Sequence, residues 1–196
     1  MKTGIIILAA GNSSRLGKPK QLLNYQGETL LTIVSKAAMQ SSCEPIVIVL
    51  GAYATEISAQ HRLSELTYVI NENWEAGMSS SIAVGMSAIL KHAEDLEQVI
   101  IAVSDQPFIN AEIFENLIKK QQESGKGIIA SSYAETWGTP ALFNKKYFHQ
   151  LLSLNGNQGA KHLLKLYQKD CSSLNFELGY VDIDTTSDYN NLNLYR

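Results

Sequence analysis

The chain has 196 residues, of which 45% are apolar and 18% charged, as in folded globular proteins rather than disordered ones. Its formal net charge of -3 argues against a general nucleic-acid-binding protein, because such proteins normally carry a basic face. No apolar run approaches the roughly 20 residues that a membrane-spanning helix needs, so we expect no membrane segment.

Two features favour a cytoplasmic location. The N-terminus leads almost directly into an apolar run, without the basic region and small-residue cleavage site of a secretory signal. The two cysteines, Cys43 and Cys171, lie far apart and lack metal-ligand spacing, so we expect both to be reduced thiols.

Apolar runs and stretches of helical periodicity alternate along the chain. The runs predict strands at residues 5–8, 46–50, 68–70, 99–103 and 127–131. The helical spacing of apolar residues predicts helices at residues 29–39, 55–66, 79–92 and 111–123. This alternation predicts an α/β fold, a Rossmann-like three-layer sandwich with a mostly parallel sheet and helices on both faces. Without a repeat, low-complexity run or linker, residues 1–196 are expected to form a single domain.

The stretch GIIILAAGNSSRLGKPKQLL, residues 4–23, combines a predicted buried strand with a loop of small residues and cations. Gly11 lets a ligand approach the backbone closely, and inward-turned N–H groups of such a loop can hold an anion. Arg15, Lys18 and Lys20 add positive charge in the same loop. The pattern indicates a polyphosphate site, although an ordinary strand-to-helix loop with solvated lysines has the same local composition.

The segment LAAGNSSRLGKPKQLL resembles the signature L-A-A-G-x-S-x-R-[ML]-G-x-x-K of the MobA-like NTP transferases, the nucleotidyltransferases that attach a nucleotide to molybdopterin. It does not follow the Walker pattern, because no Gly-Lys-Ser/Thr closes the loop. The resemblance implies a fold of the nucleotide-diphospho-sugar transferase type, with Arg15 and Lys20 as catalytic residues. It also implies that the first part of the nucleotide site is formed by Leu8, Ala9, Ala10, Gly11, Arg15 and Lys20.

Asp105 follows the predicted strand at residues 99–103, in the stretch SDQP. Ligands of parallel sheets bind at the carboxyl ends of strands, so a carboxylate here is well placed to hold Mg²⁺ beside phosphate oxygens. An aspartate at such a junction can equally cap the next helix. A D-Q-P motif carries the magnesium-binding aspartate in the family that the chain resembles, which implies that Asp105 is a metal ligand and catalytic residue, with Mg²⁺ as cofactor.

Residues 73–81, NWEAGMSSS, join a loop to a predicted helix. The free N–H groups of a helix N-terminus and nearby serine hydroxyls suit a base, ribose or phosphate, but serines at this place can also be N-caps. The family that the chain resembles has a similar segment at its nucleotide site, which implies nucleotide contacts at Gly77 and Ser81. Trp74 either stacks on a ligand or covers the core.

Three further segments resemble motifs of the same family, in the same order. Gly138-Thr139-Pro140 resembles a G-x-P turn beside the acceptor substrate, and GNQGAK at residues 156–161 resembles G-D-x-G-A-[RK]. Asn157 stands where aspartate is usual, so it can hydrogen-bond or offer a carbonyl to a metal but adds no charge. VDIDTTSDY at residues 181–189 resembles the closing D-I-D-T-P-x-D-Y.

In this last segment, strand-like alternation places Asp182 and Asp184 on one side and Ile183 on the other, and a short helix is expected to start at residues 185–188. A solvated strand end followed by a helix cap explains these aspartates equally well. The resemblance implies that the acceptor substrate is bound by Gly138, Pro140, Asn157 and Asp184.

The resemblance as a whole implies a molybdenum cofactor nucleotidyltransferase of the cytidylyl type. Members that use GTP resemble L-A-G-G at the position where this chain has LAAG, residues 8–11. The implied substrates are CTP and molybdopterin, with an apo-molybdoenzyme or its maturation chaperone as a further partner, and no nucleic acid or membrane is expected to bind. Two alternatives stay open: a nucleotidyltransferase for a sugar phosphate or alcohol phosphate, and a non-catalytic molybdopterin-binding chaperone.

Overall fold

A computed structural model describes residues 1–156 and 159–195 of the chain. Its main sheet has seven strands in the order β5-β4-β1-β6-β8-β7-β9. Strand β8 pairs antiparallel with β6 and β7, and the other pairings in this sheet are parallel. The strands of the sheet are β1 (Thr3–Ala9), β4 (Ile46–Leu50), β5 (Thr67–Ile70), β6 (Gln98–Val103), β7 (Ile128–Tyr133), β8 (Thr136–Asn144) and β9 (Cys171–Asn175).

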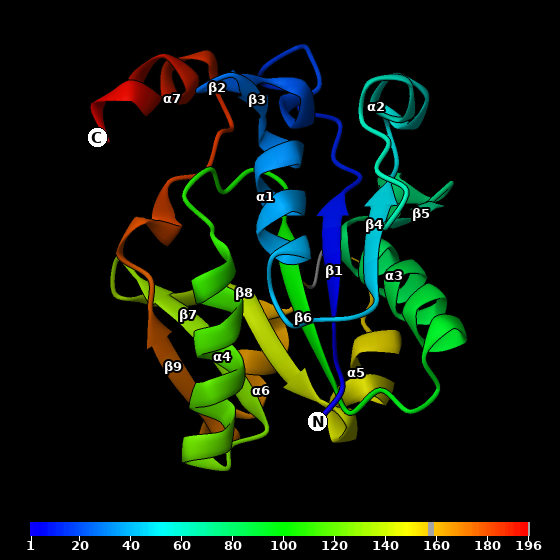
Figure 1. Ribbon diagram of the computed structural model, residues 1–196, viewed down its shortest axis with the longest axis vertical. Coiled ribbons are helices and arrows are strands. Elements are labelled where there is room, and N and C mark those ends of the chain that lie inside the picture. Colours follow the sequence, from blue (N-terminus) through cyan, green and yellow to red (C-terminus); the bar gives the residue numbers. More distant parts are fainter. Residues whose placement is uncertain (157–158, 196) are drawn as a thin grey trace.

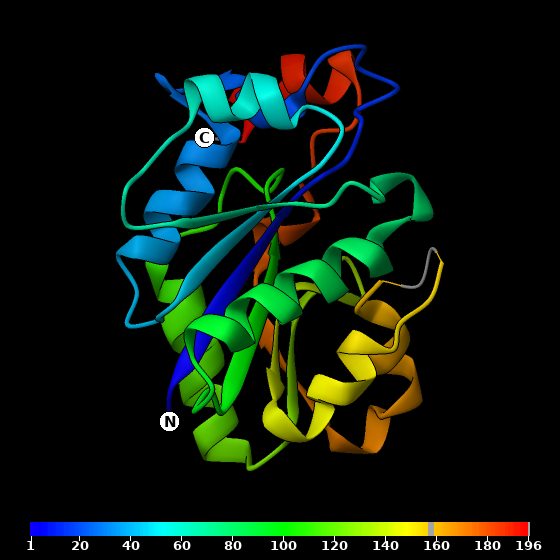
Figure 2. The same cartoon turned by 90° about the vertical axis from the view of Figure 1, so that its right-hand side faces the viewer.

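Helices cover both faces of this sheet, which confirms the predicted fold class (Figures 1 and 2). One face carries α1 (Leu30–Met39), α2 (Ala54–Gln60) and α4 (Ala111–Ser124), and the other carries α3 (Met78–His92), α5 (Phe148–Leu152) and α6 (Lys161–Leu166). None of the helices in the described parts of the chain combines the length and apolar character that crossing a membrane would require.

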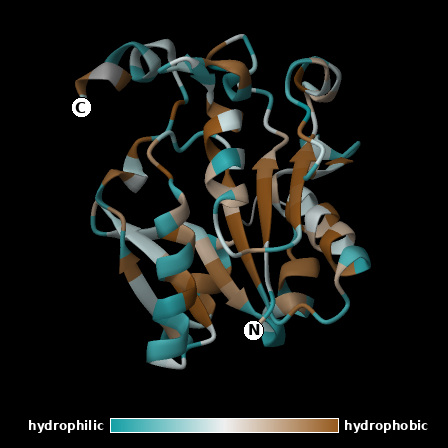
Figure 3. Ribbon diagram, viewed as in Figure 1, coloured by the Kyte–Doolittle hydropathy of each residue, from teal (hydrophilic) through white to brown (hydrophobic). Residues whose placement is uncertain are grey.

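Strand β1 is buried along its whole length, as its unbroken apolar run predicts. Figure 3 shows the apolar residues concentrated in the central strands. Ile5, Ile7 and Ala9 pack in the core beneath α1 and α4, whereas Ile6 and Leu8 pack in the core beneath α3. Because side chains alternate between the faces of a strand, this register decides which side chains near the end of β1 can face a ligand.

Beyond the carboxyl end of β1, the helix α7 (Thr186–Asn191) lies beside the hairpin of β2 (Asn24–Tyr25) and β3 (Glu28–Thr29) (Figure 1). Leu23 and Tyr25 share an apolar cluster with Ile183 and Leu192. The Tyr189 hydroxyl also donates to the Asn24 carbonyl oxygen at 2.7 Å. These contacts fix the C-terminal segment against the segment that follows the first loop.

Two predicted elements are wrong in extent or kind. The helix expected at residues 55–66 ends at Gln60, because His61 has an extended backbone and the chain then turns towards β5. The segment around Asp182 and Asp184 is irregular rather than a strand, since it pairs with no strand of the sheet. The predicted alternation nevertheless holds there: Ile183 is fully buried.

The turn expected at Gly138–Pro140 is also wrong, because these residues lie inside β8. The pairing of β8 with β7 shifts its register there: Ala141 pairs with Ala130, but Gly138 pairs with Ser131. Thr139 and Pro140 are therefore the extra residues of a β-bulge, one of the few places in a sheet where proline is tolerated.

Candidate functional site

The loop after β1 is held by the side chain of Gln21. This side chain is 1% exposed, and its Nε2 donates to the carbonyl oxygens of Ala9 at 2.9 Å and Gly11 at 3.2 Å. The Ser13 hydroxyl accepts from the backbone N–H of Lys20 at 3.2 Å. The loop thus folds back on its own start, so that Lys20 is presented at the carboxyl end of β1 and not in free solvent.

Lys20 lies between two carboxylates. Its Nζ is 2.5 Å from Asp105 Oδ2 and 2.8 Å from Asp184 Oδ1. The side chains of Lys20 and Asp105 are only 15% and 13% exposed. Burial by itself would lower the pKa of Lys20, but the charge of Asp105 and hydrogen bonds to both carboxylates outweigh it and raise that pKa above its ordinary value. Lys20 is therefore a fixed positive charge at the centre of the site.

Asp105 owes its place to β6, whose apolar strand ends at Val103 beside β1. Asp105 does not cap the next helix: Asn110 is the N-cap of α4 and accepts from the backbone N–H of Ile113. One oxygen of Asp105, Oδ2, bonds to Lys20. The other, Oδ1, is buried and has no hydrogen-bond partner within the described part of the chain.

Asp182 and Asp184 reach the same place from the irregular segment that precedes α7. The hydrogen bond from Lys20 holds the pKa of Asp184 below its ordinary value, and Arg15 Nη2 lies 3.1 Å from Asp184 Oδ2. Burial, followed by repulsion from Asp105 and Asp184, raises the pKa of Asp182. The neighbouring Asp188 has a local structural role, because it is the third residue of α7 and forms a capping box with the N-cap, Thr185.

Two pockets meet at Lys20. The first, which we call the β1-loop pocket, has a volume of about 310 Å³. It is lined by Leu8, Ala10, Gly11, Asn12, Lys20, Gln21, Trp74, Glu75, Gly77, Met78, Ser81, Val103, Ser104 and Asp105.

The second, which we call the β8 pocket, has a volume of about 500 Å³. It is lined by Lys20, Met78, Val103, Asp105, Gln106, Tyr133, Thr139, Gly159, Ala160, Lys161, Gly179, Tyr180, Asp182 and Asp184. Lys20, Met78, Val103 and Asp105 belong to both walls, so the two pockets adjoin at the Lys20–Asp105 ion pair.

The structure brings together most of the residues expected at a nucleotide site. Those that line the β1-loop pocket are Leu8, Ala10, Gly11, Lys20, Gly77, Ser81 and Asp105. Ala9 is not among them, because its side chain alternates to the opposite face of β1 and packs in the core beneath α1. Arg15 lines neither pocket: its side chain is 70% exposed and lies against Asp184 at the outer edge of the site.

The residues expected at an acceptor site are placed less uniformly. Asp184 lines the β8 pocket, and so does Thr139, but its neighbours Gly138 and Pro140 are not among the lining residues. Gly138 packs so tightly against Tyr133 that a Cβ there would come within 2.0 Å of the tyrosine hydroxyl. Asn157 lies outside the described residues.

The segment before α3 has the geometry of a ligand wall. Gly77 has a φ of 98°, in the region that favours glycine, and precedes the first residue of α3. None of the three serines is its N-cap. Ser81 instead accepts a hydrogen bond from the buried Asn71 Nδ2 at 3.0 Å, which fixes its hydroxyl at the pocket. Trp74 both packs against the core and lines the pocket.

Several lining residues carried no clear signal in the sequence. Gln21 and Gln106 directly follow Lys20 and Asp105, and that adjacency was the only available hint. Tyr133 lies at the end of β7, lines the β8 pocket and packs against Gly138, next to a bulge in β8 that the sequence does not predict. Asp182 belongs to a recognisable motif, but only the folded chain brings the charges of Asp105 and Asp184 close to it.

The donor atoms of this centre fit a hard divalent cation such as Mg²⁺. The buried Oδ1 of Asp105 lacks a partner among the described residues, and the Asp184 carboxylate lies across Lys20 from it. No cluster of three acidic, histidine or cysteine residues suited to a metal occurs in residues 1–156 and 159–195. Mg²⁺ typically takes one or two carboxylates and completes its shell with substrate phosphates and water, so this sparse donor set suits it.

Comparison with known families identifies the group to which this site belongs. The model of the MobA-like NTP transferase domain matches residues 5–172. The chain belongs to this family. It is therefore a nucleotidyltransferase of the MobA-like type, and the matched range includes both the loop of Lys20 and the position of Asp105.

Three curated relatives of this MobA-like chain bear different names. Nicotine blue oxidoreductase of Paenarthrobacter nicotinovorans is 31% identical over 71% of this chain and 66% of its own length. The purine catabolism protein PucB of Bacillus subtilis is 26% identical over 94% of this chain and 92% of its own. The molybdenum cofactor cytidylyltransferase of Escherichia coli is also 26% identical, over 94% and 92%.

Solved structures are similar over almost the entire chain. Rv0371c of Mycobacterium tuberculosis, solved in complex with manganese, has a TM-score of 0.79 at 25% identity and covers 98% of each chain. The 4-diphosphocytidyl-2C-methyl-D-erythritol synthase of Anaerococcus prevotii has a TM-score of 0.75 at 16% identity, covering 100% of this chain and 96% of its own. The latter likeness supports the fold alone.

Proposed function

We propose that this nucleotidyltransferase transfers CMP from CTP to molybdopterin and releases pyrophosphate. The observation that carries the proposal is the junction of two pockets at Lys20 and Asp105. A reaction between two bound substrates requires two sites that adjoin at the reacting phosphate. The names of the relatives differ, so the choice of CTP and molybdopterin as substrates is argued from the motif residues at these pockets and not from any one name.

The β1-loop pocket suits the nucleotide. The backbone at Gly11 is open, since no heavy atom beyond its chain neighbours lies within 4 Å of the place where a Cβ would stand, and phosphate oxygens can approach it. Gly77 and Ser81 lie across the pocket, where the N–H groups that begin α3 and the serine hydroxyl can meet the base or ribose. A pocket of this size and mixed lining is typical of small-molecule sites.

The β8 pocket suits a flat, phosphorylated acceptor such as molybdopterin. Lys20 and Lys161 supply positive charge for its phosphate, and Tyr133 and Tyr180 offer aromatic surfaces for a ring system. Asp182 and Asp184 can accept hydrogen bonds from ring N–H groups. A sugar phosphate or alcohol phosphate would use the cations and carboxylates but gain less from the tyrosines.

In the proposed reaction, an oxygen of the terminal molybdopterin phosphate attacks the α-phosphorus of CTP. The new P–O bond forms as the bond to the bridging oxygen of the β-phosphate breaks, and pyrophosphate leaves with that electron pair. The attacking oxygen belongs to the substrate, so the chain needs no nucleophile of its own. Its task is to position both phosphates and to offset the negative charge that grows on the leaving group.

Lys20 and Arg15 are the cations for that task. Lys20 lies at the junction of the pockets and is held there by two carboxylates. Arg15 is exposed beside Asp184, from which its guanidinium can turn to clamp triphosphate oxygens in two parallel hydrogen bonds. Asp105, with Asp184, would hold Mg²⁺, which when bound polarises the phosphate under attack.

A label-transfer assay tests the proposal. The protein is incubated with CTP labelled at the α-phosphate, Mg²⁺ and molybdopterin, and labelled cytidylylated molybdopterin is the expected product. Label transfer to a sugar phosphate or alcohol phosphate but not to molybdopterin would contradict the acceptor. Tight binding of molybdopterin without any transfer would contradict catalysis and favour the chaperone alternative.

A further inference from the structure

Gln106 occupies a central place that the proposed reaction does not use. It directly follows Asp105, is only 3% exposed and lines the β8 pocket. Buried glutamine side chains need hydrogen-bond partners, so the partners of this amide report what it holds together.

The amide of Gln106 joins two segments that are distant in the chain. Its Nε2 donates to the carbonyl oxygen of Thr139 at 2.9 Å and to that of Gly179 at 2.7 Å. Thr139 belongs to the bulge of β8, and Gly179 belongs to the short 3₁₀ helix η5 (Glu177–Tyr180). Both residues line the β8 pocket. One side chain therefore ties two walls of this pocket to the loop that carries Asp105.

Tyr133 depends on the same arrangement. A Cβ at Gly138 would come within 2.0 Å of the Tyr133 hydroxyl, and a Cβ at Gly179 would come within 2.5 Å of its ring. The tyrosine ring thus lies against glycines of both segments that Gln106 joins. If either segment moved, the aromatic wall of the pocket would move with it.

The second polar atom of this amide, Oε1, is buried and lacks a hydrogen-bond partner within the described residues. The assignment of oxygen and nitrogen follows from the network, because two carbonyl oxygens require the N–H₂ group as donor. An unpaired buried acceptor is costly, so its presence at this pocket calls for an explanation such as a functional role of the residue.

We infer that Gln106 is a positioning residue of the acceptor pocket: its side chain holds the β8 bulge and η5 in place against the loop that carries Asp105. The identity of the acceptor in this inference rests on the proposed function. Gln106 and the two residues that it joins, Thr139 and Gly179, line the β8 pocket and not the β1-loop pocket, so we expect the nucleotide side to depend little on this amide. Loss of the amide should therefore weaken the acceptor's binding and leave that of CTP intact.

The first test separates the two substrates kinetically. Gln106→Met keeps the length of the side chain but donates no hydrogen bond to the two carbonyls. We expect KM for molybdopterin to rise at least about tenfold, while KM for CTP changes by less than about twofold. Gln106→Asn retains the amide on a shorter side chain that cannot reach both carbonyls. It should raise the ratio of the KM for molybdopterin to the KM for CTP in the same way, and it provides the test if Gln106→Met does not fold.

Gln121 provides a matched control. It is also a buried glutamine, 6% exposed, whose Nε2 donates to a backbone carbonyl, that of Lys126. It lines neither pocket. Gln121→Met should lower the melting temperature without changing the ratio of the two KM values. An equal rise of both KM values in Gln106→Met, or the same rise in Gln121→Met, would overturn the inference.

Hydrogen exchange provides a readout without any substrate. In Gln106→Met, amides of residues 136–144 and 177–180 should exchange at least about tenfold faster than in the wild type, whereas Gln121→Met should leave them unchanged. Unchanged exchange in both segments would overturn the inference. If the wild type does not accept molybdopterin, the proposed function fails, and this exchange experiment still decides the role of Gln106.

Discussion

The ammonium group of Lys20 lies 2.5 Å from a carboxylate oxygen of Asp105, although 85 residues separate them in the chain. They meet because β1 and β6 are adjacent parallel strands, whose carboxyl ends lie at the same edge of the sheet. Lys20 also holds Asp184, so one cation balances two carboxylates. A triphosphate that draws Lys20 towards it would leave these carboxylates free for a divalent cation.

Asp105→Asn should reduce kcat/KM by at least about 100-fold, or roughly 2.7 kcal/mol. The change removes the charge that a metal complex needs, while Lys20 keeps Asp184 as a partner, so the melting temperature should fall by only a few degrees. Steady-state kinetics and thermal unfolding check both parts. A variant that retains most of the activity would show that Asp105 is not the metal ligand.

Lys20→Met should make the stability of the protein depend on divalent cations. Without the ammonium group, Asp105 loses its cation and Asp184 keeps only the exposed Arg15, so the two partly buried carboxylates repel each other and the melting temperature falls. Mn²⁺ or Mg²⁺ should restore it without nucleotide, since a ligand that binds only the folded state stabilises it.

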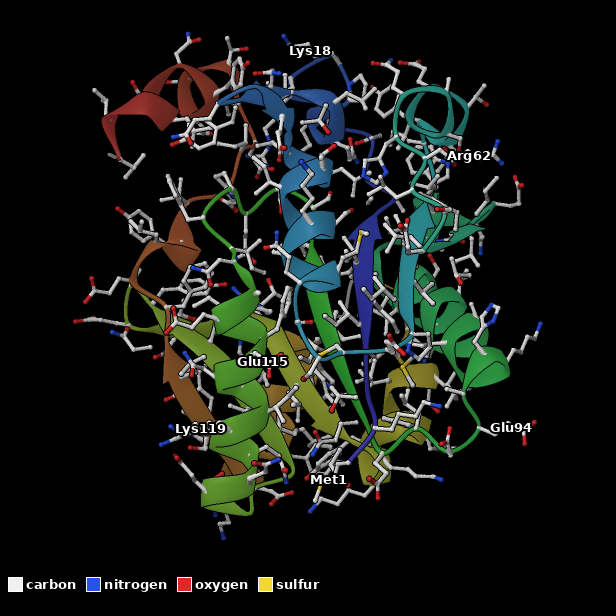
Figure 4. The ribbon with its side chains drawn as sticks, in the orientation of Figure 1. Met1, Lys18, Arg62, Glu94, Glu115 and Lys119 are labelled. Carbon is white, nitrogen blue, oxygen red and sulfur yellow. The ribbon has the colours of Figure 1, made fainter. Side chains whose placement is uncertain are left out.

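Thermal unfolding over a Mn²⁺ titration measures this effect, and Lys18→Met is its control. Lys18 is an exposed cation of the same loop, near the Tyr189 ring and at the outer edge of the molecule (Figure 4). The control and the wild type should show little response to Mn²⁺. If Lys20→Met responds no more than they do, the carboxylates do not form a cation site.

Arg15→Lys should lower kcat/KM much more than Lys18→Ala. A lysine cannot reproduce the two parallel hydrogen bonds of a guanidinium to phosphate oxygens. Arg15 is also tied to Asp184, whereas Lys18 lies in solvent near Tyr189. Rate measurements on both variants under saturating acceptor decide the point, and losses of similar size would show that the roles of the loop cations are misassigned.

The parts of the fold that the sequence predicts well are those with unbroken local signals. The run Ile46–Leu50, bounded by Pro45 and Gly51, is strand β4 with the same limits. Asp105 could be placed at a strand end for the same reason, because the apolar run before it is β6. Local apolar patterns report burial directly, and burial at the centre of this sheet is almost complete.

The parts that it does not predict depend on contacts between distant segments. Asp184 meets Lys20 because Ile183 packs into the cluster of Leu23 and Tyr25, about which the local pattern says nothing. The motif at Gly138–Pro140 predicts a turn, but the pairing partners on β7 make it a bulge. Such tertiary contacts override local propensity, and they decide the walls of the β8 pocket.

Asp182→Asn should raise the melting temperature near neutral pH. The pKa of Asp182 lies above its ordinary value, so its ionised form is less favourable in the folded than in the unfolded chain. The gain in stability should be complete above the raised pKa of Asp182 in the folded chain. It should disappear below the pKa of about 3.9 in the unfolded chain, because Asp182 is then protonated in both the folded and the unfolded chain.

Asp95→Asn is the control of opposite sign. The pKa of Asp95 is lowered, chiefly by its hydrogen bond from Lys2, so its contribution to stability is present above the unfolded pKa and lost as the pH falls. This variant should gain no stability at neutral pH. If Asp182→Asn behaves in the same way in a pH series of thermal unfolding, the charge of Asp182 is not a cost to the free protein.

We expect the preference for the base to depend on Ala10, which lines the β1-loop pocket. The Ala10 methyl group packs against Gly51, because a Cβ added to Gly51 would come within 2.7 Å of the Ala10 Cβ and 2.9 Å of the Trp74 Cβ. This part of the pocket wall therefore has little spare room. A pyrimidine needs less room there than a purine, and buried polar groups that meet the cytosine edge would be left unpaired by another base.

We expect CTP to exceed GTP by at least about tenfold in kcat/KM, or roughly 1.4 kcal/mol. Ala10→Gly should narrow this gap while activity with CTP persists, and parallel rates with the two triphosphates measure it. A preference of the wild type for GTP would contradict the role of Ala10.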